Sequence, residues 1–141
     1  MPTPKAVVLV IRELVIKAEN DLTTAAHTLT LAVDTPTDTV SFHAQQCVEK
    51  YLKALLVPLA TPFPKTHNIR SLLALIAARF RPKIDGKDKD RLTEYATVMR
   101  YPGVGTDILL TEARHAVAVA RRVRKQVRRH LPRAALRGLG K

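Results

Sequence analysis

The stretch that decides the fold is FHAQQCVEKYLKALL, residues 42–56. Together with Val40, its apolar side chains recur at steps of three and four residues, which is the spacing of one face of an α-helix. These positions are Val40, Ala44, Cys47, Val48, Tyr51, Leu52 and Leu55. A dense polar run lies between and beside them, formed by His43, Gln45, Gln46, Glu49, Lys50 and Lys53. The stretch therefore predicts a packed helix that also carries a polar groove.

The same helical periodicity continues on both sides of this stretch. A long helix is expected from about Val7 to Leu29, and the quoted helix should stop before Pro58, because proline lacks the amide hydrogen. A third helix is expected after Thr66 as its N-cap, a fourth around Leu92–Tyr101 and a fifth from about Thr106. The chain is therefore predicted to be all-α, an antiparallel (up-down) bundle of about five helices spanning residues 1–131. Residues 132–141 should form a basic, flexible C-terminal tail.

Positive charge is concentrated at the C-terminal end of the chain. The formal net charge is +12, and residues 121–141 contain nine basic side chains and no acidic one. Cations near a helix C-terminus are favoured by the helix dipole, which accounts for one or two of them. The remainder form an electrostatic footprint suited to a polyanion such as a phosphate backbone.

Composition also sets several exclusions. The single cysteine, Cys47, allows no internal disulfide and is expected to be a buried packing residue. No apolar run is long enough to span a membrane and no signal peptide is recognisable, so a cytoplasmic location without membrane association is expected. The five histidines show no metal-site spacing, so neither a metal nor a cofactor is expected. His27 and His115 lie close to apolar stripes and should be packed or partly buried.

Polar residues at three helix junctions form a candidate ligand site. His43, Gln46, Lys50 and Lys53 follow one another at steps of three, four and three residues, so they share one helical face. A bundle could bring them next to His67 at the start of the third helix, and next to Arg100 and Tyr101 at the end of the fourth. This arrangement favours a groove for a phosphate or a nucleotide. Two alternatives stay open: a solvated helix face, and an interface with a second protein chain.

Three sequence motifs in this order resemble a known family. HAQQCVEKYLKA is followed by KTHNI at residues 65–69 and RYPG at 100–103, and AENDL at 18–22 fits the pattern A-x-x-D-L. Over about residues 5–128 the chain resembles the HEPN family (higher eukaryotes and prokaryotes nucleotide-binding domain). The resemblance implies a helical bundle that is commonly a homodimer and binds nucleotide or RNA. It also implies a minimal nucleotidyltransferase as partner, in a pair of the toxin–antitoxin type.

Many members of this family are metal-independent endoribonucleases, with an arginine followed by four to six residues and a histidine. The histidine would move the 2′-hydroxyl proton while the arginine stabilises phosphate charge. In this chain no histidine follows Arg100 until His115, whereas Arg124 and His130 match the spacing. Catalysis by Arg124 and His130, or by Arg100 with a spatially adjacent histidine, is therefore an alternative function. A dimerisation or interaction module without a ligand is the other.

Overall fold

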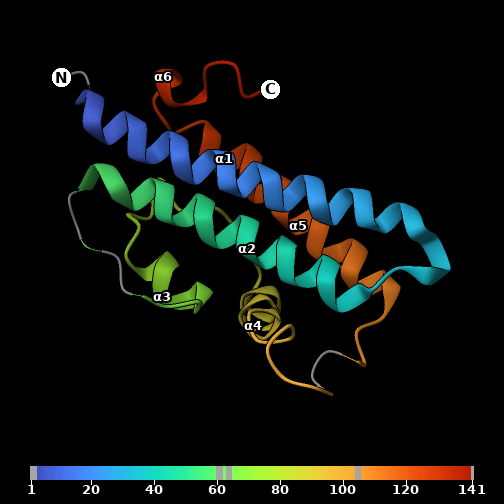
Figure 1. The fold of residues 1–141 in the computed structure, drawn as a ribbon. Coiled ribbons are helices and arrows are strands. Elements are labelled where there is room, and N and C mark those ends of the chain that lie inside the picture. The colour runs from blue at the N-terminus through green and yellow to red at the C-terminus, as the bar shows by residue number, and fades with distance from the viewer. Residues whose placement is uncertain (1–2, 60–61, 63–64, 104–105, 141) are drawn as a thin grey trace.

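Three long helices form the body of the molecule. The computed structural model describes residues 3–59, 62, 65–103 and 106–140. Helix α1 (Lys5–Thr28) runs antiparallel to α2 (Thr37–Leu56), and α5 (Leu110–Arg128) packs behind them (Figure 1). A 3₁₀ segment, η1 (Leu29–Asp34), connects α1 to α2, and η2 (Val57–Leu59) follows α2. No strand occurs in the described ranges, so the predicted all-α antiparallel bundle is confirmed.

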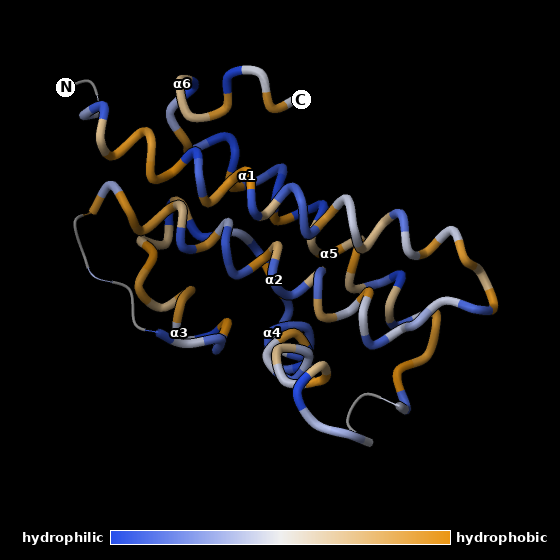
Figure 2. The backbone as a smooth tube through the Cα atoms, in the orientation of Figure 1, coloured by the Kyte–Doolittle hydropathy of each residue, from blue (hydrophilic) through white to orange (hydrophobic). Residues whose placement is uncertain are grey.

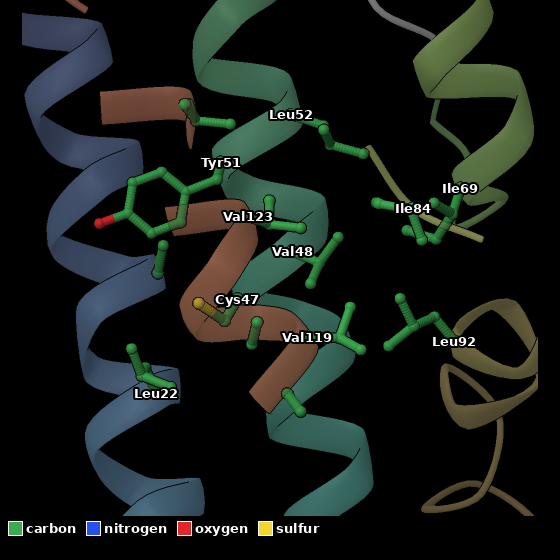
Figure 3. Close-up of a cluster of buried hydrophobic side chains, with 14 of the residues drawn as sticks. Leu22, Cys47, Val48, Tyr51, Leu52, Ile69, Ile84, Leu92, Val119 and Val123 are labelled. Atoms are coloured by element: carbon green, nitrogen blue, oxygen red, sulfur yellow. The ribbon is translucent and has the colours of Figure 1, made fainter. Parts of the chain in front are cut away.

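Helix α2 is the centre of the bundle. It packs against α1 and α5 on one side, and against α3 (Ile69–Ala74) and α4 (Gly86–Tyr95) on the other. In Figure 3, Tyr51 lies toward α1, while Leu52 and Val48 lie toward Ile69 and Leu92. In Figure 2 the hydrophobic colour recurs at short intervals along α1, α2 and α5, as expected for helices with a buried stripe. Because α2 is covered on several sides, even polar residues such as Gln45 and Glu49 are buried.

The structure shows the environment of Cys47 and the character of the helices. Cys47 is fully buried in the core, which confirms the packing assignment. Burial raises the pKa of its thiol, and the negative charge of Glu19 raises it further. Among the described residues, no helix has both the length and the apolar character needed to cross a lipid bilayer.

The short helices begin and end at other residues than the sequence predicts. The N-cap of α3 is Asn68, not Thr66, because the Asn68 side chain accepts a hydrogen bond from the amide of Ser71 at 3.0 Å. Helix α4 begins at Gly86, before the expected Leu92, and ends at Tyr95, before the expected Tyr101. Between Tyr95 and Arg100 the chain forms hydrogen-bonded turns. One of them is closed by a bond from Arg100 N to Thr97 O (3.0 Å). Arg100 is therefore carried by a turn rather than by the end of a helix.

The last long helix starts later than expected, and two histidines are not packed. Helix α5 begins at Leu110 rather than near Thr106, and the preceding segment is held by the Thr37 hydroxyl, which donates to Ile108 O at 2.7 Å. His27 and His115 are both exposed, contrary to the expectation of packed side chains. His115 lies on the outer face of α5 and contacts Asp88 of α4 at 2.9 Å, so a polar neighbour replaces the expected apolar one.

Beyond Leu131 the sequence predicts a flexible tail, whereas the structure folds part of it onto α1. Helix α6 (Arg133–Leu136) lies beside the N-terminal half of α1, and Ala135 is buried there (Figure 1). Arg12 of α1 donates to the carbonyl oxygen of Arg137 at 2.6 Å. The small apolar side chains of this segment can pack against α1. The basic composition of the segment gives no indication of this packing. The division of the chain at residue 131 stays a prediction.

Candidate functional site

The first part of the predicted groove is organised by an acid on α1. Asp21 lies opposite α2 and accepts a hydrogen bond from His43 Nδ1 at 2.8 Å through one carboxylate oxygen. Its other oxygen pairs with the ammonium group of Lys50. His43 and Lys50 are seven residues apart, two turns of the helix, so both reach the same neighbour on α1. Asp21 therefore fixes two of the predicted phosphate-binding side chains.

The second part is organised by Glu49, whose side chain is only 5% exposed. It accepts hydrogen bonds from Gln45 Nε2 (3.0 Å), Lys53 Nζ (3.0 Å) and His67 Nδ1 (2.6 Å). Burial acts to raise the pKa of Glu49, but the hydrogen bonds from His67, Gln45 and Lys53 outweigh it and hold the pKa below its usual value. Glu49 is therefore a buried carboxylate that stays charged.

Arg100 lies on the far side of the His67 ring. Its Nη2 atom is 3.4 Å from His67 Nε2, and the His67 side chain is 42% exposed. Because a carboxylate can only accept, Nδ1 of His67 carries the hydrogen that bonds to Glu49. In the neutral ring this leaves the Nε2 lone pair to accept from Arg100. The three residues form a chain from a buried acid, through an imidazole, to an exposed guanidinium.

A separate ion-pair network holds Arg124 inside the bundle. The Nε atom of Arg124 is 2.9 Å from both carboxylate oxygens of Glu19, which also accepts from Arg128 (3.2 Å) and from the Tyr51 hydroxyl (2.7 Å). Burial favours a higher pKa for Glu19, but the hydrogen bonds from Arg124 and Tyr51 and the charges of both arginines lower it. Arg124 therefore has a structural partner within the protein.

A family model described as HEPN domain matches residues 11–130. The chain belongs to the HEPN domain family. Neither the curated proteins nor the solved structures gave a match.

This HEPN domain arranges most of the predicted binding residues in two hydrogen-bonded groups along α2, one around Asp21 and one around Glu49. We call the set defined here the α2 polar network: Asp21, His43, Gln45, Gln46, Glu49, Lys50, Lys53, His67 and Arg100. Gln46 joins it through a 2.6 Å hydrogen bond from its Nε2 to Gln45 Oε1. Tyr101 follows Arg100 in the chain but is exposed, and within the described residues it makes no hydrogen bond to the network.

Sequence reasoning missed the two acids that organise the α2 polar network. In the sequence, Asp21 stands out only as part of the AENDL motif, and Glu49 only as a polar residue near Gln45. Neither pattern indicates that these carboxylates pair with the cations of α2. Their pairing with lysines also changes the electrostatics, because the charges of Lys50 and Lys53 are matched by Asp21 and Glu49. Arg100, by contrast, has no carboxylate partner in the described residues. In the same part of the chain, no group of three or more potential ligands could hold a metal ion.

The proposed catalytic pair Arg124 and His130 contacts different parts of the HEPN domain. Arg124 bonds to Glu19 of α1, whereas the His130 ring packs edge-on against Phe80, with ring centroids 5.1 Å apart. The two side chains line different cavities, which share Lys125. Their joint catalytic role stays a prediction.

Proposed function

We propose that this HEPN domain is a nucleotide- or RNA-binding subunit and that it binds phosphate at the α2 polar network. The observation that carries the proposal is the exposed guanidinium of Arg100. The one hydrogen bond of the guanidinium in the described residues is to Nε2 of His67, so it keeps donors for an incoming phosphate. A planar guanidinium can bind phosphate through two parallel hydrogen bonds.

In this proposal the other predicted residues have graded roles. His43 and His67 contact phosphate beside Arg100, while Lys50 and Lys53 contribute charge that Asp21 and Glu49 partly offset. Gln46 and Tyr101 orient the remainder of the ligand. No cofactor or metal is part of the proposal.

The proposed protein partners are a second copy of the chain and a minimal nucleotidyltransferase, as in toxin–antitoxin pairs of the family. Support comes from large apolar side chains at the surface close to Arg100 in the chain. Met99, Tyr101 and Leu109 are 49%, 59% and 63% exposed. Exposed apolar side chains that gather near one segment are typical of a protein-binding surface. The cytoplasm is the proposed location.

The test is calorimetric titration of Arg100→Ala and Lys50→Ala with ATP, GTP and structured RNA, without added metal. Arg114→Ala is the matched control, because Arg114 is exposed on α5 and outside the network. Loss of binding by Arg100→Ala with an unchanged oligomeric state supports the proposal. Loss of the oligomer supports an interaction module without ligand. If neither binding nor assembly changes, phosphate does not bind at Arg100.

A metal-independent endoribonuclease is the second candidate, favoured by the contact between Arg100 and His67. A phosphate that accepts from Arg100 would free His67 Nε2 to take the proton of the RNA 2′-hydroxyl. The 2′-oxygen would then attack phosphorus, and the P–O5′ bond would break as the 5′-oxygen gains a proton. The products would be a 2′,3′-cyclic phosphate and a 5′-hydroxyl.

Two variants locate any such cleavage activity. Loss in His67→Ala but not in His130→Ala would assign it to the α2 polar network. The reverse result would assign it to Arg124 and His130. Wild-type cleavage in both variants would eliminate both assignments.

A further inference from the structure

A second basic site lies beside the C-terminal half of α5 and shares no residue with the α2 polar network. A cavity of about 420 Å³ is formed between the segment 79–83 and the C-terminal half of α5. Six cationic side chains line it: Arg79, Arg81, Lys83, Arg122, Lys125 and Arg129. Arg122 and Lys125 come from α5 and Arg129 from its C-cap, at steps of three and four residues that place them on one face. The other three come from the segment.

Among the residues that the structure describes, no acidic side chain lines this cavity. In the described part of the chain, none of the six cations is within ion-pair distance of a carboxylate. This contrasts with the α2 polar network, where both lysines have a carboxylate partner. The helix dipole favours Lys125 and Arg129 at the end of α5, but it does not account for three more cations on a segment outside that helix. Like charges held this close repel one another unless an anion joins them.

The two walls of the cavity are held together by contacts that do not use the cationic head groups of Arg122, Lys125 and Arg129. The backbone amide of Lys83 donates to Gln126 Oε1 at 2.8 Å, and Phe80 packs against the ring of His130. Ile84, just beyond the segment, is buried in the core. The guanidinium of Arg81 is positioned by its donation to Ile76 O at 2.8 Å. The charges are therefore gathered by the fold before any ligand arrives, which lowers the entropy lost on binding.

The density of charge indicates the class of ligand. Adjacent phosphates in an oligophosphate share a bridging oxygen, whereas successive phosphates of a nucleic acid backbone are separated by a sugar. An oligophosphate can therefore present more negative charge to a cavity of about 420 Å³ than a nucleic acid backbone of the same length. Arginine and lysine are the side chains that bind such groups most strongly.

We infer that this cavity binds a contiguous oligophosphate, such as the triphosphate group of a nucleoside triphosphate or an inorganic polyphosphate. The site is independent of phosphate binding at Arg100. It gives the chain a receptor for a densely charged phosphate group on the flank of α5 opposite Glu19.

The experiment is calorimetric titration of the full chain with inorganic tripolyphosphate at physiological salt. The double variant Arg122→Ala/Arg129→Ala should bind it about tenfold or more weakly, because each substitution removes a charged hydrogen-bond donor. Lys5→Ala/Lys17→Ala, on the exposed face of α1, removes the same charge elsewhere and should bind like the wild type. Arg122→Lys/Arg129→Lys keeps the charge and should recover most of the affinity, which assigns the loss to the charge at these two positions.

The outcomes separate this inference from the proposed function. Arg100→Ala should leave tripolyphosphate binding unchanged, even if it abolishes RNA binding. Tighter binding of ATP than of tripolyphosphate would identify a nucleoside triphosphate as the source of the phosphates, and equal binding a free polyphosphate. The inference is overturned if tripolyphosphate does not bind, or if the α1 double variant loses as much affinity as the α5 one. It is also overturned if a 5′-hydroxyl RNA oligonucleotide displaces tripolyphosphate at an equal phosphate concentration.

Discussion

Glu49 and His67, 18 residues apart in the chain, are joined by a 2.6 Å hydrogen bond between Oε1 and Nδ1. This bond ties the segment before α3 to the central helix. It also fixes which nitrogen of His67 faces outward, toward Arg100. A buried acid thus sets the orientation of the exposed end of the candidate site.

Replacing Glu49 with glutamine should disturb both stability and the His67 ring. The variant keeps the shape of the side chain but removes the charge that accepts from His67 and Lys53. We expect the free energy of unfolding to fall by about 1–3 kcal/mol in urea denaturation. Long-range ¹H–¹⁵N spectra should show His67 protonated at Nδ1 in the neutral wild type and a mixture of tautomers in the variant. Glu13→Gln, at an exposed position on α1, is the control, and an unchanged His67 spectrum in Glu49→Gln would contradict the assignment.

Acid should weaken the fold through Glu19 and Glu49. Both pKa values lie below the usual 4.5 in the folded protein, despite burial, because arginine, lysine, histidine, glutamine or tyrosine donors bond to the carboxylates. The stabilisation is therefore present above pH 4.5 and is lost as the pH falls through the folded-state values. Glu19→Gln should be less stable at neutral pH, and its stability should decline less steeply on acidification. Parallel stability–pH curves for variant and wild type would refute this linkage.

The C-terminal segment should detach when Arg12 is replaced by alanine. Arg12 holds the segment through the carbonyl oxygens of Arg137 (2.6 Å) and Ala135 (3.5 Å). We expect faster amide hydrogen exchange in 133–140, with little change in α2. Lys17→Ala, elsewhere on α1, should leave this exchange unaltered. Exchange that is already fast in the wild type would instead agree with the flexible tail predicted from the sequence.

Cys47 should resist alkylation while the protein is folded. Its side chain is buried, and burial together with the charge of Glu19 raises the pKa of the thiol, so little thiolate is present. Reaction with iodoacetamide should require unfolding and should accelerate in denaturant in step with loss of helical circular dichroism. Labelling in native buffer at the rate of a free thiol would show that the core around α2 opens locally.

Much of the helical framework could be predicted from local pattern. The three- and four-residue periodicity around Val48 and Val123 identified α2 and α5, and Pro58 marked where α2 ends. The short helices were less predictable. Asn68 replaced Thr66 as a cap, and α4 ended before Arg100, because packing against α2 and single side-chain bonds outweigh weak local propensity.

The sequence by itself determined that this chain is a helical bundle of the HEPN family, because apolar periodicity and motif order are properties of neighbouring residues. Only the tertiary structure decided which charges are neutralised. Lys50 pairs with Asp21, and Arg124 pairs with Glu19. The cations of 79–83 share a cavity with those of α5, and no acid of the described ranges lines it. Ion pairs between distant residues depend on which helix faces meet when the core packs. A charge that looks equivalent in sequence can therefore be paired with a carboxylate inside the bundle in one place and lie in a cavity lined by other cations in another.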